Sequence, residues 1–397
     1  MACMAAVRAL ASELTMTRKA RICQVISGYF RNDPRVFHRQ TKSLRDAGYD
    51  VSVLTNDGLD DEEADGIRIR STALLLRSRA AVLCLATWQF WRACREERAD
   101  VYQLHSPELV PLGLMLKRFG YLVVYDAHED LPSHILEKEW LPRYVRRPIS
   151  FFVERMLKYA FKRFDGIVSP HQHVVDAVKQ INSNTELVAN FAKVGVTAAP
   201  QSGRMSARRP IVCYSGTMYL HSSQLETLSA VNAIPGVKYH VAGYMPDELR
   251  VQLEGHPGYG NLVFHGRLAW EDLGDFYNEA VAGLVVIGLT QNLGGRRGTY
   301  AVNKLFEYME AGLPVVCTAS DLWNEIIAEY NCGIAVEPGS VRQIQSAIEL
   351  LVGNRRLAEE MGDNGRRAVL ERFNWTKEEE KYLSVFRRVL DKAGPVN

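Results

Sequence analysis

Two histidines follow consecutive predicted strands in the first half of the chain. His105 ends the segment DVYQLH (100–105), and His128 lies just after a strand predicted over 122–125. An imidazole changes its charge near neutral pH, so it can transfer protons or donate hydrogen bonds to a substrate. Ligands of parallel α/β sheets bind outside the carboxyl ends of the strands, where both histidines are expected. The sequence therefore predicts a functional role for at least one of them; the alternative is that each only caps its loop.

A second set of polar residues surrounds the start of a helix predicted within 299–318. A loop of glycines and arginines precedes this helix, and Gly312 and Pro314 end it before a short apolar strand. A helix N-terminus attracts anions because its first backbone N–H groups are unpaired and its dipole is positive there. The candidate residues are Arg296, Arg297, Asn303 and Lys304, with the Glu307 carboxylate one turn further along. The alternative is an ordinary surface helix with a basic loop.

The order of strands and helices predicts how these groups are positioned. A strand over 21–27 ends at Gly28, a helix follows over 36–47 and a second strand over 49–55. This order is a βαβ unit, which implies a parallel sheet, although the dinucleotide fingerprint GxGxxG is absent. The alternation restarts with a strand over 210–214 and the tight turn Ser215-Gly216-Thr217.

We therefore expect an α/β fold with two Rossmann-like domains and a cleft between them. The first domain is expected over 18–197 and the second over 210–375, joined by a linker over 198–209 that is rich in small and basic residues. A poorly ordered leader is expected over 1–17. A final helix over 376–397 is expected to pack back on the first domain.

Composition limits the class of protein. The 397 residues include 47% hydrophobic and 24% charged residues, which is typical of a globular protein, and the net charge of +2 argues against a nucleic-acid partner. The seven cysteines are scattered without metal-ligand spacing, as in reduced cytosolic proteins. No apolar run reaches the roughly 18 residues of a membrane span. The acidic run 57–65 matches no calcium loop and is predicted to be a solvated loop.

Residues 137–164 differ from their surroundings in charge and aromatic content. Eight basic side chains outnumber three acidic ones, which gives a local charge of +5 among interleaved aromatic residues. Such a segment can lie on an anionic membrane surface, at about 1 kcal/mol for each basic residue held near it. The alternative is a packed helix with a solvated basic face.

Four motifs in order make the chain resemble the family-4 glycosyltransferases of bacterial surface-polysaccharide or glycoconjugate synthesis. That family has the GT-B fold of two Rossmann-like domains. The resemblance covers nearly the whole chain after the leader. The motifs are NDPRVFHRQTKSLRDAGYDVSVLT (32–55), DVYQLHSPELVPLGLMLKRFGYLVVYDAHEDLP (100–132), NKLFEYMEAGLPVV (303–316) and NCGIAVEPGSV (331–341).

The resemblance implies roles for individual residues. The second domain would bind a nucleotide-diphosphate sugar, with Glu307 accepting hydrogen bonds from the ribose and the helix start at 302–304 facing the diphosphate. The turn at Gly216 and Thr217, and Gly28 in the first domain, would let phosphate approach the backbone. The resemblance also implies that His105 lies near the transferred sugar, and His128 is expected on the acceptor side of the cleft.

Two departures from the family pattern concern charge at the donor site. The family commonly has a glutamate eight positions before the ribose-binding one, where this chain has Thr299, and a lysine soon after the turn at Gly216, which is missing here. The family needs no metal or other cofactor for transfer. We expect Arg267, Lys304, Arg296 or Arg297 to supply the positive charge that stabilises the leaving diphosphate.

The sequence thus predicts a cytoplasmic hexosyltransferase-type enzyme, active at the inner face of the membrane. It would transfer a sugar from a nucleotide-diphosphate donor, its co-substrate, to a glycan, lipid-linked or small-molecule acceptor, without a metal and with retention of configuration. Two alternatives remain at this stage. One is a nucleotide-sugar 2-epimerase on the same fold, and the other is a catalytically silent glycosyltransferase-like binding subunit.

Overall fold

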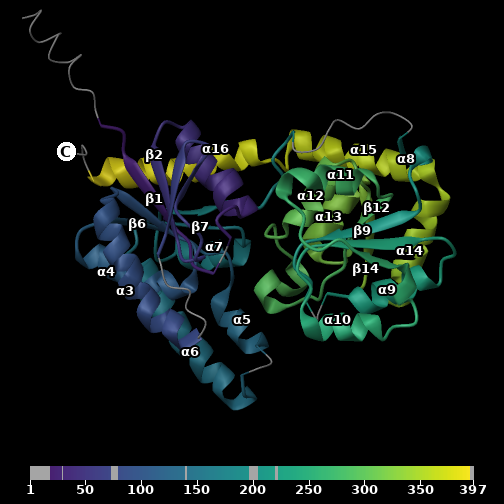
Figure 1. Cartoon of the computed structure of the whole chain (residues 1–397), viewed down its shortest axis with the longest axis horizontal. Helices are drawn as coiled ribbons and strands as arrows, with labels where there is room; N and C mark the ends of the chain where they lie inside the picture. The colour runs from purple at the N-terminus through teal and green to yellow at the C-terminus, as the bar shows by residue number, and fades with distance from the viewer. Residues whose placement is uncertain are drawn as a thin grey trace, which may run out of the picture.

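The chain forms two α/β domains that lie side by side (Figure 1). The computed structural model describes residues 18–28, 30–72, 79–138, 141–195, 204–219 and 222–393. The leader expected over 1–17 and part of the expected linker lie outside these residues. In Figure 1 the purple and blue first domain is on the left and the green second domain on the right.

The first domain is built on one sheet with strand order β3-β4-β2-β1-β5-β6-β7-β8, in which only β3 is antiparallel to its neighbour among the described residues. Its elements are β1 (Arg21–Val25), η1 (Pro34–Thr41), α2 (Lys42–Asp46), β2 (Asp50–Thr55), β3 (Glu62–Ala64), β4 (Ile67–Ser71), α3 (Arg79–Glu97), β5 (Val101–Leu104), η2 (Pro107–Leu109), α4 (Val110–Arg118), β6 (Leu122–Asp126), α5 (Leu131–Glu137), α6 (Arg143–Phe161), β7 (Gly166–Ser169), α7 (Gln172–Lys179) and β8 (Thr185–Leu187).

Two apolar layers cover the faces of this sheet. Side chains of α3, α4 and α6 form one core with the lower face in Figure 1, and α2 contributes Leu44 to a smaller core on the other face. The strands are short continuous apolar runs because both faces are covered. The helical segment η1, a π-helix, begins where the Asp33 carboxylate accepts hydrogen bonds from the backbone N–H groups of Arg35 and Val36, and Pro34 occupies the first helical position.

The second domain has a sheet of order β11-β10-β9-β12-β13-β14, with each described pair parallel. Its elements are α8 (Arg204–Ala207), β9 (Ile211–Ser215), α9 (Gln224–Asn232), β10 (Lys238–Ala242), α10 (Asp247–Glu254), η3 (Tyr259–Asn261), β11 (Leu262–Phe264), η4 (Trp270–Asp272), α11 (Leu273–Asn278), β12 (Ala282–Val285), η5 (Gln291–Leu293), η6 (Gly295–Arg297), α12 (Asn303–Glu310), β13 (Val315–Thr318), α13 (Asp321–Tyr330), β14 (Gly333–Val336), α14 (Val341–Gly353), α15 (Arg355–Glu371) and α16 (Trp375–Ala393).

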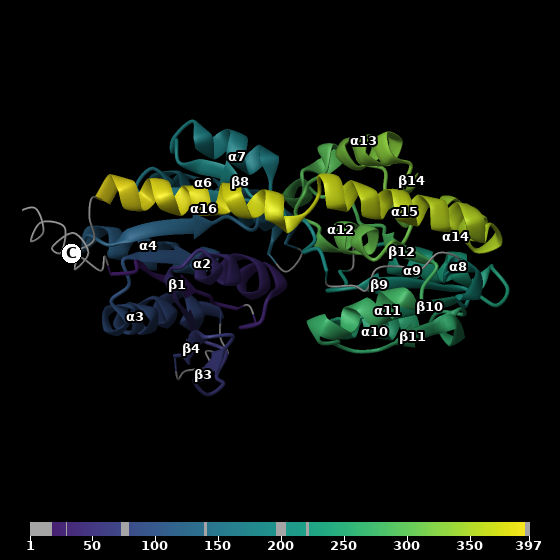
Figure 2. The same cartoon turned by 90° about the horizontal axis from the view of Figure 1, so that it is seen from above.

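The last two helices run in line along both domains (Figure 2). Helix α15 packs on the second domain against α12, whereas α16 crosses to the first domain and packs beside η1, α2, β7 and β8. Trp375, Tyr382 and Phe386 of α16 are buried in the core that Leu44 shares. The first domain therefore completes one of its hydrophobic cores with α16.

Several details differ from the sequence expectations. The acidic run 57–65 contains β3, and Asp57 forms an ion pair with the largely buried Arg31, so this run is not simply a solvated loop. Helix α7 follows β7 without having been predicted. Residues Arg204–Ala207 of the expected linker form α8, because Met205 is buried against the second domain.

Two further findings concern the cysteines and the character of the helices. Cysteines with described side chains are buried and unpaired, namely Cys23, Cys94, Cys213, Cys317 and Cys332. None of the described helices combines the length and the apolar character that a membrane span requires.

Candidate functional site

The carboxyl ends of the two sheets face each other, and the domains are in contact there. Asn190, just after β8, donates hydrogen bonds to the carbonyls of Tyr300 and Ala301 in the second domain. The Glu137 carboxylate at the end of α5 accepts hydrogen bonds from the backbone N–H groups of Gln291 and Asn292 in η5. Two elements of the first domain therefore contact the second domain directly at this boundary.

The start of α12 brings together most of the predicted anion-binding groups. Gly216 has a φ of +108°, and a β-carbon there would lie 3.4 Å from the Lys304 ammonium, so Lys304 extends along the turn that follows β9. The ammonium also lies 4.8 Å from the centre of the Tyr214 ring. The Oδ1 atom of Asn303 is buried without a hydrogen-bond partner among the described residues. A polar turn, a cation and an unpaired amide thus meet at a helix N-terminus.

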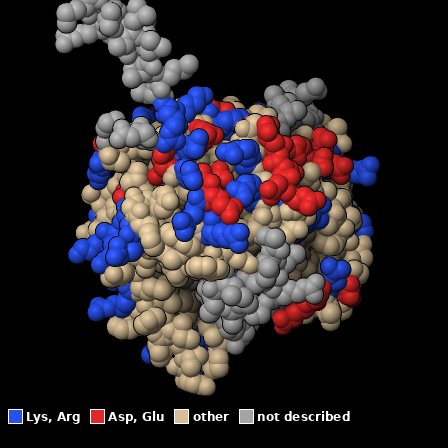
Figure 3. Space-filling model, turned by 60° about the vertical axis from the view of Figure 1, so that its left-hand side comes forward, with Lys and Arg blue, Asp and Glu red and all other residues tan. Residues whose placement is uncertain are grey.

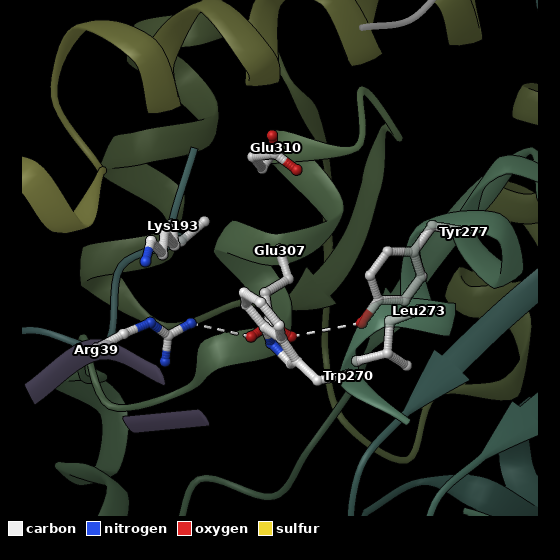
Figure 4. A pocket seen from close by; sticks show the side chains of 8 residues that line it. Arg39, Lys193, Trp270, Leu273, Tyr277, Glu307 and Glu310 are labelled. Atoms are coloured by element: carbon white, nitrogen blue, oxygen red, sulfur yellow. Dashed lines mark hydrogen bonds and ion pairs between the residues drawn. The ribbon is translucent and has the colours of Figure 1, made fainter. Parts of the chain in front are cut away.

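Glu307 lies one turn further along α12 and faces a narrow pocket between the domains (Figure 4). Its carboxylate accepts a hydrogen bond of 3.1 Å from Arg39 of the first domain, and Tyr277 of α11 donates to its other oxygen over 3.4 Å. Trp270 lies across the front of the carboxylate in Figure 4, with Lys193 on the side of Arg39. The carboxylate therefore has polar partners from both domains.

Arg39 is the least satisfied group in this pocket. Its side chain is 1% exposed, yet Nε and Nη1 have no hydrogen-bond partner among the described residues, and only Nη2 contacts Glu307. Burial lowers the pKa of Arg39, although Glu307 opposes this shift. An arginine nevertheless keeps its charge in proteins, so two buried donors point at no acceptor.

The three arginines predicted from the sequence lie on the rim. Arg267 lies 4.1 Å from the centre of the Phe30 ring and so reaches across to the first domain. Arg296 and Arg297 are largely exposed, at 64% and 63%, and lie 4.0 and 3.6 Å from the carboxylates of Glu337 and Asp176. The latter two guanidinium groups are therefore engaged with carboxylates away from α12.

The two predicted histidines of the first domain meet at the Asp126 carboxylate. The distances from Asp126 Oδ2 are 3.1 Å to His128 Nε2 and 3.5 Å to His105 Nδ1, and the two ring nitrogens are 3.3 Å apart. Burial alone would raise the pKa of Asp126, but Arg35 and the histidines outweigh it and hold that pKa well below its usual range. Burial also lowers the pKa of His105, so its ring is neutral near pH 7.

This cluster brings three potential metal-ligand atoms within 4.8 Å of one another. The same Asp126 oxygen already accepts hydrogen bonds from Gln40 over 2.6 Å and from Arg35 over 3.0 Å. A guanidinium beside that oxygen repels a cation, so the donor set fits a hydrogen-bonded network better than a metal site.

Thr299 occupies a buried position at the boundary between the domains. Its hydroxyl accepts a hydrogen bond from the Ala301 backbone N–H and lies 3.0 Å from His171 Nδ1. His171 Nε2 donates to the His128 carbonyl over 2.9 Å, so Nδ1 of the neutral ring accepts the Thr299 proton. Burial lowers the pKa of His171 to about 4. The residue at the position of the family glutamate thus supports the loop of His128.

Gly28 and Thr217 lie in the loops that follow β1 and β9, respectively. Gly28 has a φ of +75° after β1, and its N–H donates to Asn56 over 3.4 Å. Thr217 is exposed, and its carbonyl accepts a hydrogen bond from Tyr214. Gly243, which the sequence analysis did not single out, has a φ of +134°, and a β-carbon there would clash with the backbone of Gly216.

Sequence reasoning missed the buried polar residues of η1. Arg35, Arg39 and Gln40 lie on the helix that enters the cleft, and each contacts a carboxylate far away in sequence. A signal for them was available in the segment NDPRVFHRQ (32–40). Its polar residues lie in and just before the predicted helix, close to the end of the first predicted strand.

Two protein families match this chain in sequence. The glycosyl transferase 4-like domain matches residues 34–190, and the glycosyl transferases group 1 family matches residues 197–368. A curated relative, an uncharacterized glycosyltransferase of Methanocaldococcus jannaschii, is 26% identical over 260 residues. That match covers 62% of this chain and only 64% of the relative.

Solved structures show the same fold. Sucrose-phosphate synthase from Thermosynechococcus elongatus has a TM-score of 0.73 at 16% identity, covering 94% of this chain and 100% of that one. WaaG, a glycosyltransferase involved in lipopolysaccharide biosynthesis, has a TM-score of 0.69 at 14% identity, with 92% and 99% covered. HepE of Anabaena, in complex with UDP and glucose, has a TM-score of 0.68 at 12% identity, with 93% and 99% covered.

Proposed function

The chain belongs to the GT-B glycosyltransferases, with a 4-like domain followed by a group 1 domain, and we propose that it uses a nucleotide-diphosphate sugar as donor. The acceptor in this proposal is a glycan or lipid-linked glycan of bacterial surface-polysaccharide synthesis. Transfer proceeds with retention of configuration and without a metal ion.

The observation that carries this proposal is the arrangement around α12. Glu307 presents a carboxylate at a pocket between the domains, and Lys304 lies beside the open turn at Gly216 less than one helical turn before it. A ribose bound by the carboxylate would direct its diphosphate toward the ammonium and the helix N-terminus. These groups stabilise a leaving diphosphate by fixed positive charge, the role that a divalent ion has in other transferases.

The first domain supplies the groups for the transferred sugar in this proposal. His105 and His128 lie at Asp126, at the carboxyl ends of β5 and β6. The His128 side chain is 13% exposed and can form a hydrogen bond with a sugar hydroxyl, whereas His105 is fully buried and would act through His128. Closure of the domains on the donor would expel water from this region, which protects an activated sugar from hydrolysis.

A panel of nucleotides tests the donor site. Melting temperatures are measured with UDP, GDP, dTDP and UDP-glucose, because a ligand that binds only the folded protein stabilises it by RT ln(1 + [L]/Kd). At least one of these ligands should raise the melting temperature, and Glu307→Ala should abolish that increase.

The control is Glu325→Ala, which removes an exposed carboxylate on α13. This variant should keep the full increase. A protein that none of the four ligands stabilises would contradict the proposed donor class, and an unchanged increase in Glu307→Ala would contradict the role of Glu307 alone.

We further propose that α6 holds the enzyme at an anionic membrane surface, where a lipid-linked acceptor would be found. Four aromatic side chains of this helix are strongly exposed: Tyr144 at 81%, Phe152 at 72%, Phe151 at 63% and Tyr159 at 54%. Arg143, Arg147, Arg155 and Lys158 of the same helix are also exposed. Figure 3 shows that this side of the molecule has a broad uncharged lower face with Lys and Arg along its left margin.

Vesicle co-sedimentation tests this surface. The protein should sediment with vesicles that contain an anionic phospholipid and not with neutral phosphatidylcholine vesicles, because each basic residue near the surface contributes about 1 kcal/mol. The double substitution Phe151→Ser and Phe152→Ser should reduce binding severalfold. Leu370→Ser, on the exposed side of α15, serves as the control and should not change binding.

A further inference from the structure

A closed circuit of hydrogen bonds lies beneath the two histidines of the first domain. It connects Asp126 to His105 by a second route, which passes through four side chains that are fully buried. In order along this route the residues are Asp126, Gln40, Gln103, Tyr382, Gln24 and His105. They come from η1, three strands of the sheet, the loop after β5 and the C-terminal helix α16.

The direction of each hydrogen bond follows from Asp126. Its carboxylate is ionised and can only accept, so Gln40 must present its NH₂ group, 2.6 Å away. The Gln40 carbonyl oxygen then accepts from the NH₂ group of Gln103 over 2.9 Å. The Gln103 carbonyl oxygen in turn accepts from the Tyr382 hydroxyl over 2.5 Å. Three successive side chains therefore have only one orientation that satisfies them all.

The same reasoning reaches His105. Because the Tyr382 proton is given to Gln103, the Tyr382 oxygen accepts from the NH₂ group of Gln24 over 3.4 Å. The Gln24 carbonyl oxygen then faces His105 Nε2 and requires a donor there. We propose that Tyr382, on the last helix of the chain, is a positioning residue that fixes His105 in the tautomer with its proton on Nε2.

This tautomer is the opposite of the one that Asp126 alone would favour. The Nδ1 atom of His105 lies 3.5 Å from Asp126 Oδ2, and a carboxylate at that position attracts a proton onto Nδ1. With the proton on Nε2, the Nδ1 lone pair instead faces Nε2 of His128, 3.3 Å away. The His128 Nε2 proton is shared between this lone pair and the carboxylate, which fixes the tautomer of His128 as well.

The circuit therefore determines which nitrogen of each imidazole carries a proton at the site. Any effect on sugar transfer rests on the proposed function, whereas the tautomer of His105 does not. The two can consequently be tested separately.

Histidine-selective ¹⁵N NMR on the full chain measures the tautomer directly, with the His105 signals assigned by their loss in His105→Gln. In the wild type, His105 should carry its proton on Nε2. Tyr382→Phe keeps the packing of the ring and removes only the hydroxyl. One lost hydrogen bond of about 1 kcal/mol should change the tautomer ratio of His105 about fivefold toward Nδ1.

The matched control is Trp375→Phe, which removes a hydrogen bond from the same helix to Ser43, outside the circuit. This variant should leave the His105 signals unchanged. Gln103→Met breaks the circuit at a second point and should reproduce the change, which keeps the test open if Tyr382→Phe fails to fold.

Two results would overturn the proposal. One is a wild-type His105 that carries its proton on Nδ1. The other is a folded Tyr382→Phe or Gln103→Met protein whose His105 tautomer ratio equals that of the wild type, since Tyr382 would then only support the packing of α16.

Discussion

Two buried arginines on η1 have contrasting surroundings. Arg35 is 2% exposed and donates hydrogen bonds to both oxygens of Asp126, to the Val188 carbonyl and to the Asn190 amide oxygen. Arg39 follows four residues later and is 1% exposed, but only its Nη2 atom has a partner. All three nitrogens of the Arg35 guanidinium therefore have acceptors, whereas two of the three nitrogens of Arg39 have none among the described residues.

The contrast indicates that the Arg35 guanidinium stabilises the fold, whereas the Arg39 guanidinium has donors available to a ligand. Buried donors without acceptors are rare because each costs about 1–3 kcal/mol, so a protein keeps them only where something else supplies the acceptor. Arg35 holds the first domain together at Asp126. Arg39 faces the pocket of Glu307, and we infer that its unpaired donors bind acceptor groups of the nucleotide.

The largest expected effect comes from removing Arg35. Arg35→Met leaves the Asp126 carboxylate buried without its main counter-charge, so the free energy of unfolding should fall by about 3–5 kcal/mol. Urea unfolding of the two proteins measures the difference.

The control for Arg35 is Glu329→Gln, which breaks the exposed ion pair with Arg372. It should change the free energy of unfolding by at most about 1 kcal/mol. A loss in Arg35→Met that is no larger than in this control would remove the contrast between the two arginines.

The second expected effect is a dependence of stability on pH through His171. Its pKa is lowered to about 4 by burial, so the unfolded chain binds a proton that the folded chain does not as the pH falls below about 6.5. The contribution of the neutral His171 to the free energy of unfolding is thus fully present above pH 6.5 and is lost as the pH falls toward 4. This loss amounts to up to about 3 kcal/mol. Urea unfolding between pH 4 and 7 of the wild type and His171→Gln checks this. Parallel curves for the two proteins would show that His171 does not contribute.

A smaller effect is expected for Arg39→Met. The substitution loses one hydrogen bond to Glu307 but also removes two unsatisfied buried donors, so the free energy of unfolding should change by less than about 1 kcal/mol. The increase in melting temperature with nucleotide should nevertheless be smaller than in the wild type. A loss of stability as large as that of Arg35→Met would place both arginines in the same structural role.

The smallest effects are expected on the rim. Arg296→Ala and Arg297→Ala remove exposed guanidinium groups beside other carboxylates, so nucleotide binding should change less than twofold. Lys304→Ala should weaken binding more than either, because the ammonium lies at the turn of Gly216. Binding constants for UDP from calorimetry give the order. If all three substitutions changed the binding constant equally, UDP binding would depend only on the overall charge of this region and not on the position of Lys304.

The sequence predicted the fold well because the strands are buried on both faces. The strands predicted over 49–55 and 210–214 agree with β2 and β9 to within one residue at each end. The edge strand β3 was missed because Glu62 and Glu63 carry charges that an apolar pattern does not include.

The site was predicted only in part, because its remaining contacts are not local. Glu307, Lys304 and the histidines stood next to helix and strand ends, which a sequence shows. Arg35 and Arg39 have their carboxylate partners 91 and 268 positions away, and no periodicity along the chain indicates such pairs.

The crossing of α16 has a consequence for how the protein is made. The first domain emerges from the ribosome long before residues 375–393 are synthesised. Trp375, Tyr382 and Phe386 nevertheless belong to its core. During synthesis the strands around Gln24 and Gln103 therefore lack their last partner until the second domain has been translated. The core that Leu44 shares with α16 is therefore completed only after the whole second domain has been synthesised.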